Sequence, residues 1–151
     1  MKRTVTALTL AATMFASSAS AFDPDDLQKL KDTDQCRECD LRGANLIGAN
    51  LIDADLSRAD LSRADLTGAY LGSASLVNAN LSGANLMVAF LSGANLRSAN
   101  LEGANLPSAS LVNADLSGAN LAGVDLKYAT MNGAILCNTI MPNKLVIYSG
   151  C

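Results

Sequence analysis

The sequence predicts an all-β solenoid, in which very short strands wind into a coil, and two observations support this fold class. First, residues 39–138 divide into twenty consecutive units of the form Ala-(Asn/Asp)-Leu-x-x, with Leu third in nineteen units and Ala first in eighteen. Second, nine of the eleven glycines stand at the fifth position, where a bending chain needs relaxed backbone angles. Each unit is therefore expected to be a short strand followed by a corner.

The spacing within a unit predicts which residues form the core. A period of five fits neither the 3.6-residue helix nor the two-residue strand, so neither element continues through the repeat. Ala and Leu lie two apart, so an extended backbone points both to one side, which we assign as inward. Leu81 is thus expected inside and Asn80 outside. Burying one Leu fully stabilises a fold by about 1.5–3 kcal/mol, so nineteen can supply the core.

The Ala-(Asp/Asn)-Leu-x-x units resemble those of the pentapeptide-repeat family, and the resemblance covers about two thirds of the chain. It implies a right-handed, quadrilateral parallel β-helix with four units per coil and about five coils. Residues twenty apart would then stack on one another. At the usual strand spacing, the rod would be about 24 Å long.

Residues 1–21 are predicted to be a secretory signal peptide. Lys2 and Arg3 precede an apolar stretch at 5–15 without acidic residues, and residues 19–21 form a small-x-small cleavage site. The apolar stretch is too short to serve well as a membrane anchor, and no Cys follows the site for lipid attachment. We therefore expect an exported protein, periplasmic or extracellular, without stable membrane insertion, whose mature chain begins at Phe22.

Residues 22–38 are expected to form an N-terminal cap with a short helix over 23–33. Asp23 can cap the helix, Pro24 suits its first turn, and Leu27 and Leu30 fall on one face. A β-helix exposes core residues and unpaired strand edges at its ends, so we interpret the helix as a lid on the first coil. Docking of a partner is the alternative role for this helix.

The four cysteines are expected to form two structural disulfides, Cys36–Cys39 and Cys137–Cys151, one at each end of the rod. Cys36 and Cys39 fall at inward positions of the repeat frame. Zinc or a redox-active pair would be the competing roles for C-x-x-C, but the chain has no His and no βαβ pattern. An even cysteine count in an exported chain favours a disulfide. Cys137 falls at an outward position, where it is available to bond Cys151.

Residues 139–151 are expected to form a C-terminal cap. The repeat stops at 138, and a turn at 141–144 precedes a short apolar, strand-like run at 145–148. This closing segment resembles that of many exported members of the family. The resemblance implies that it folds over the last coil.

A stripe of exposed apolar residues is the candidate interaction surface. Tyr70 and Phe90 replace Asn or Asp at the second position and lie twenty apart, so they should stack. The other members fall on the preceding side of the same corner: Ile47, Met87, Val88, Pro107 and Tyr128. The alternative is an ordinary scatter of apolar surface residues. A functional stripe should be the sole sizeable apolar patch, with a second rod or an extended apolar ligand lying along it.

The sequence predicts no catalytic, cofactor-binding or metal-ligating residue, and no cofactor. A filled tube offers no cleft, and the chain lacks His and Trp. A mixed-charge patch contains Asp53, Asp55, Arg58, Asp60, Arg63 and Asp65. Its arginines argue against a dedicated metal site, and such patches are usually solvated surface with weak ion pairs.

The predicted function is that of a non-catalytic, exported scaffold that presents rigid faces to an unknown protein partner or to a second copy in a homodimer. The alternative comes from the resemblance, because some family members are cytoplasmic DNA mimics that bind type II topoisomerases through an acidic rod. The export signal, the modest charge of the coils and their Asn-rich second positions oppose that role here. No nucleic-acid partner is expected.

Overall fold

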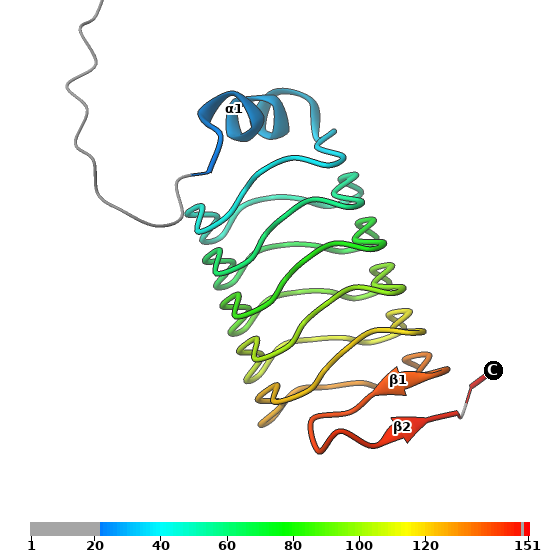
Figure 1. The fold of residues 1–151 in the computed structure, drawn as a ribbon. Helices are drawn as coiled ribbons and strands as arrows, with labels where there is room; N and C mark the ends of the chain where they lie inside the picture. Colours follow the sequence, from blue (N-terminus) through cyan, green and yellow to red (C-terminus); the bar gives the residue numbers. More distant parts are fainter. Residues whose placement is uncertain (1–21, 149) are drawn as a thin grey trace, which may run out of the picture.

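A computed structural model describes residues 22–148 and 150–151, so the predicted signal peptide at 1–21 lies outside the described residues. Residues 35–140 wind into a stack of coils (Figure 1). Helix α1 (Pro24–Thr33) lies across one end of the stack. Strands β1 (Thr139–Ile140) and β2 (Val146–Ile147) lie at the other end.

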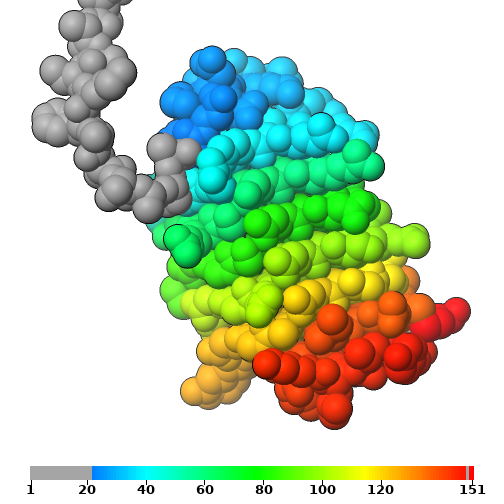
Figure 2. All heavy atoms as spheres, in the orientation of Figure 1, coloured from blue at the N-terminus to red at the C-terminus, as the bar shows by residue number. Residues whose placement is uncertain are grey.

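Each coil contains twenty residues. The second residue of each unit forms a parallel bridge with the residue twenty positions further on, from Gln35 with Asp55 to Asn120 with Ile140. Four units therefore complete one turn, as the resemblance implied. Each side of a coil contributes one bridged residue, so the coils contain isolated bridges rather than long strands. Successive coils are packed directly on one another (Figure 2).

Every corner is a tight turn that ends at the first residue of the next unit. In one such turn, the Ala84 N–H donates to the Leu81 carbonyl at 3.0 Å, and Gly83 has a φ of +64°. All twenty fifth positions have φ between +51° and +72°, although eleven of them are not glycine. A positive φ at the third residue identifies a type II turn. The predicted corner is confirmed, and it forms even at Arg58 and Val88.

The core consists of the first and third residues of the units, as predicted. The Ala and Leu side chains are buried from Leu41 to Leu121 except for Ala49, which is partly buried. In the last coil the burial is less complete. Leu126, Met131 and Leu136 hold inward positions but are partly exposed.

The Asn and Asp residues at the second position have a structural role that the sequence analysis missed. Their Oδ1 atoms accept the N–H of the residue two positions on, as Asn80 does from Ser82 at 3.2 Å. Asn80 Nδ2 also donates to Asp60 Oδ1 at 3.2 Å, and Asn100 Nδ2 donates to Asn80 Oδ1 at 3.5 Å. These bonds support the corners and link neighbouring coils, so the second position is more than solvated surface.

The predicted N-terminal helix is confirmed as α1. Asp23 Oδ1 accepts the Asp25 N–H at 2.9 Å, and Leu30 is buried as part of the common core. The Asp26 carboxylate accepts the Asp40 N–H at 2.8 Å. These contacts fix α1 against the first coil.

The C-terminal tail forms the predicted turn and pairs with the end of the coil. The Lys144 N–H donates to the Met141 carbonyl at 2.7 Å, and β2 pairs with β1 in antiparallel register. The disulfide Cys137–Cys151 holds the tail beside residues 137–140. Because the tail follows this side, it covers the last coil only in part.

Candidate interaction surface

The Tyr70 and Phe90 side chains stack on the outside of the rod, as predicted. Their ring centroids are 5.0 Å apart and the ring planes differ by 6°. Both residues are nearly half exposed, at 46% and 47%. They form a bridge pair between Asn50 and Ser110 in the same column of the coil. An aromatic stack therefore stands where the preceding column has an amide ladder, in which Asn105 Nδ2 donates to Asn85 Oδ1 at 3.0 Å.

Val88 lies at the corner that precedes this stack, in a strained conformation. Its φ is +51°, a region that β-branched residues rarely occupy. Placing a non-glycine residue there costs about 1–2 kcal/mol. Val88 and its neighbour Met87 are nonetheless exposed, at 43% and 40%. The corner thus keeps two apolar side chains in water at a position where nine units use glycine.

The rest of the predicted stripe is discontinuous. Ile47 and Tyr128 are exposed at its two ends, and the Tyr128 ring lies 5.1 Å from Lys127 Nζ. Pro107 is half-buried, so its description as an exposed member of the stripe is wrong. The polar Thr67 stands in the column between Ile47 and Met87. The dense part of the stripe is therefore short.

Ile52 is an exposed neighbour that the sequence analysis missed. It is 50% exposed and lines a shallow hollow of about 310 Å³ with Gly48, Asn50 and Tyr70. Ile52 is not in the predicted stripe because it follows the aromatic column in the chain, whereas the other predicted members precede that column. We use the name apolar corner for Ile52, Tyr70, Met87, Val88 and Phe90.

A second apolar region lies at the C-terminal end, so the expectation of a sole patch is wrong. Leu145 and Tyr148 are exposed there. A hollow of about 450 Å³ is lined by Leu126, Met141, Pro142, Asn143, Leu145 and Ile147. The physical reason is the path of the tail, which leaves part of the last coil open.

The charged side chains form exposed ion pairs instead of a pocket. Arg58 contacts Glu38 at 3.2 Å and Arg37 contacts Asp55 at 3.5 Å. Exposed pairs of this kind contribute little to stability. Among the described residues, no group of three potential metal-ligating side chains is close enough to hold an ion.

Hydrogen bonding lowers the pKa of three carboxyl groups in the coils, and at Asp40 the main cause is the bond from the Arg42 side chain. At Asp115, partial burial raises the pKa, but the bonds from the Ser117 hydroxyl and N–H and the nearby Arg97 outweigh it. The net pKa of Asp115 is below its usual range. Asp55 follows the same pattern, with Ser57 as its donor.

Both predicted disulfides are present in the structure. Cys36 and Cys39 are buried and bonded to each other, and Cys137 is bonded to the exposed Cys151. Each bridge is local to one end of the rod. No helix in the described part of the chain has the length and apolar character needed to cross a membrane.

Coils of twenty residues, an Ala/Leu core and a type II turn at every corner define a solenoid of five-residue repeats. The family model for pentapeptide repeats matches in eight copies, over residues 35–72, 64–103, 74–111 and 104–141. The chain belongs to the pentapeptide repeat family. This membership implies the right-handed, quadrilateral form of the β-helix.

Solved structures of pentapeptide repeat proteins are similar to this chain. One from the cyanobacterium Cyanothece 51142 is 36% identical, covering 73% of this chain and 92% of its own, with a TM-score of 0.53. One from Nostoc Pcc 7120 is 41% identical over 53% of this chain and 66% of its own, with a TM-score of 0.52. One from the Arabidopsis thaliana thylakoid lumen is 34% identical, covering 70% of this chain and 68% of its own, with a TM-score of 0.45. No curated protein matches the sequence.

Proposed function

We propose that this protein is an exported, non-catalytic scaffold that binds a protein partner through the apolar corner. The observation that carries the proposal is the exposed Tyr70–Phe90 stack beside the strained Val88. Aromatic residues dominate the energetic centres of protein interfaces. Backbone strain that is retained at a surface position is typical of a functional constraint.

The geometry of the corner favours a partner that lies along the rod. Tyr70 and Phe90 belong to neighbouring coils, so their stack runs parallel to the rod axis. Met87 and Val88 extend the apolar surface around the corner. A second copy of the rod has a matching long, straight face, and a homodimer is therefore the first partner to test.

The remaining features fit a rigid scaffold in an oxidising compartment. We infer that α1 closes the N-terminal end through Leu30, and that the tail partly closes the C-terminal end. Disulfides persist mainly outside the cytosol, which supports export of the mature chain from Phe22 onward. Cell fractionation tests this point, and accumulation in the cytosol would contradict it.

The central experiment replaces the stack with the residue that the repeat prefers. In the double variant Tyr70→Asn with Phe90→Asn, the new amides stand below Asn50 and extend a ladder like the one at Asn80 and Asn100. Folding should therefore be preserved. We expect the wild type to sediment as a dimer and the double variant as a monomer with an unchanged melting temperature.

The matched control is Ser75→Asn, which restores the preferred residue on a different side of the rod and should leave sedimentation unchanged.

A monomeric wild type would contradict self-association. In that case both forms serve as bait for envelope extracts, and the double variant should lose the captured partner. Equal capture by the two forms would overturn the proposal as a whole.

A further inference from the structure

Among the described residues, the first coil has an open strand edge on two of its four sides. In the next coil, the Asp65 N–H donates to the Ala44 carbonyl at 2.9 Å and the Tyr70 N–H donates to the Ala49 carbonyl at 2.9 Å. The equivalent amides one coil earlier belong to Asn45 and Asn50. These two amides have no hydrogen-bond partner among residues 22–148 and 150–151. The carbonyls of Asn45, Ile47, Asn50 and Ile52 also accept no bond among the described residues, whereas the carbonyls twenty positions later accept one from the preceding coil.

The edge is open because α1 replaces the strands that would pair with it. On the other two sides, residues 34–40 provide a layer above the first coil, as in the bond from the Asp55 N–H to the Asp34 carbonyl at 2.9 Å. Counting back twenty residues from 44–53 reaches 24–33, which is the span of α1. A helix satisfies its own backbone groups, so it covers core side chains but offers no hydrogen bonds to a strand edge.

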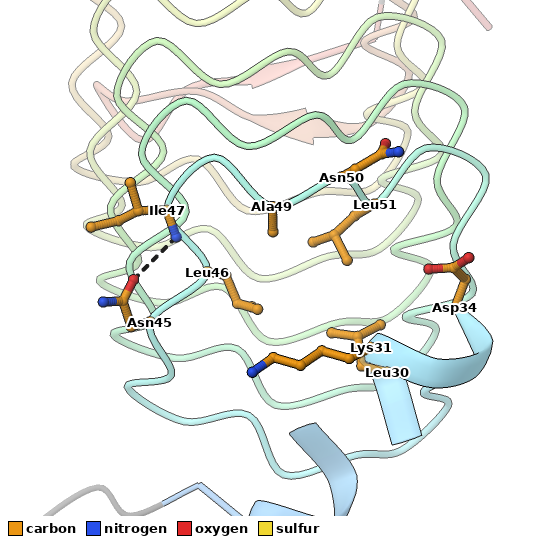
Figure 3. A pocket seen from close by; sticks show the side chains of 9 residues that line it. All are labelled: Leu30, Lys31, Asp34, Asn45, Leu46, Ile47, Ala49, Asn50 and Leu51. Atoms are coloured by element: carbon orange, nitrogen blue, oxygen red, sulfur yellow. Dashed lines mark hydrogen bonds between the residues drawn. The ribbon is translucent and has the colours of Figure 1, made fainter. Parts of the chain in front are cut away.

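A groove lies between this edge and the helix (Figure 3). Its volume is about 340 Å³, within the range of peptide-sized and small-ligand sites. Apolar residues form its floor: Leu30, Leu46, Ala49 and Leu51. Lys31 and Asp34 of the α1 side stand at its rim with opposite charges, so the groove has no strong preference for a charged ligand.

We propose that this groove binds an extended peptide segment of a partner protein by strand addition. Unpaired strand edges are templates for pairing, and added strands are recognised through backbone bonds together with pockets for alternate side chains. Among the described residues, six groups of residues 44–53 lack the inter-coil bond that their equivalents one coil later form, two donors and four acceptors, and they are set in the register of the coil. A peptide with small and leucine-like residues two apart would continue that register above residues 44–53.

The register specifies which peptide amides must be free. In the coils, the N–H of the Leu position bonds to the following coil and the N–H of the Asn position to the preceding one. In a peptide of the form Ala-Asn-Leu-x-x, the leucine amides would therefore donate to the carbonyls of Asn45 and Asn50. The asparagine amides of the peptide would point away from the protein.

The test uses the whole purified chain with its disulfides intact and a ten-residue peptide with the sequence of residues 94–103. Amide hydrogen exchange is followed residue by residue. Asn45 and Asn50 should exchange freely without peptide and at least tenfold more slowly with it. Asp65 and Tyr70 should be protected in both states. Protection of Asn45 and Asn50 without peptide would overturn the proposal, because the edge would already be covered.

Two methylated peptides provide the matched comparison. Methylation of the backbone nitrogens of both leucines should weaken binding at least tenfold. Methylation of the backbone nitrogens of both asparagines should leave binding unchanged. Equal binding of the two, or no binding of the parent peptide, would overturn strand addition. The variant Tyr70→Asn with Phe90→Asn should bind the parent peptide like the wild type, so this test is independent of the apolar corner.

Discussion

At the residue scale, Leu81 and Asn80 are neighbours in the chain that occupy opposite environments. Leu81 is fully buried, so Leu81→Asp places an unpaired charge in the core and should cost several kcal/mol. Asn80→Asp removes the Nδ2 donor to Asp60 and sets two carboxylates side by side, a smaller loss. Thermal melting of both variants measures the difference. Equal losses would contradict the assignment of inward and outward positions.

Val88 allows a test of whether strain is kept for function. Val88→Gly removes the strain of a positive φ, about 1–2 kcal/mol, and this gain exceeds or offsets the entropy cost of glycine, about 0.5–1 kcal/mol. Its stability should be equal to or higher than that of the wild type, while partner binding weakens. The control Val112→Gly has no strain to relieve and should lower stability in denaturant unfolding. A clear loss of stability in Val88→Gly would contradict the strain argument.

The lowered pKa of Asp115 predicts that the protein loses stability in acid. Its pKa is lower in the folded state than in the unfolded chain, so the folded state binds fewer protons. The stabilisation is fully present above the unfolded pKa, about 4, and is lost as the pH falls towards the folded pKa. Asp115→Asn keeps an Oδ1 acceptor and should show a shallower decline in melting temperature below about pH 4. A decline as steep as that of the wild type would contradict this role.

Much of the residue-scale structure could be predicted because the repeat determines whether each side chain points into the core or out to solvent. Burial of Ala and Leu follows from their two-residue spacing, and this is confirmed from Leu41 to Leu121 with the single exception of Ala49. The bonds from Asn and Asp to the backbone two residues on could not be predicted in the same way. They depend on the turn type, which the sequence indicates only where glycine occurs.

At the scale of elements, the tail and its disulfide should determine how firmly the last coil is held. Cys137 and Cys151 are separated by 14 positions. In the loop-entropy model a bridge of that size stabilises by about 3 kcal/mol. The double variant Cys137→Ser with Cys151→Ser should lose amide protection first in the last coil, near Ile135. Uniform loss along the rod would contradict a local role.

The elements were predictable where local signals determine them. Asp23 and Pro24 mark the start of α1, and Pro142 with Asn143 marks the turn between β1 and β2. The incomplete cover of Leu126 and Met131 was not predictable, because it depends on the path of the tail across the end of the coil. A similar reason applies to the open edge at Asn45 and Asn50.

At the scale of the whole molecule, the candidate surface was only partly predictable. The stack of Tyr70 on Phe90 follows from twenty residues per coil. Ile52 was missed because the prediction considered only residues that precede the aromatic column, whereas Ile52 follows that column and lies beside Tyr70. The second apolar region was missed because it forms at an end, where the repeat no longer determines the neighbours.

Because each coil contains twenty residues, the length of the rod and the angular position of each residue around its axis can change independently. Every residue of the repeat has a fixed angular position around the rod axis, which it shares with the residue twenty positions away. Gain or loss of twenty residues would lengthen or shorten the rod while each face keeps its identity. Gain or loss of a single unit would turn everything beyond it by a quarter revolution and break up any surface that spans the junction. Duplication of whole coils is therefore the change that such a gene tolerates best.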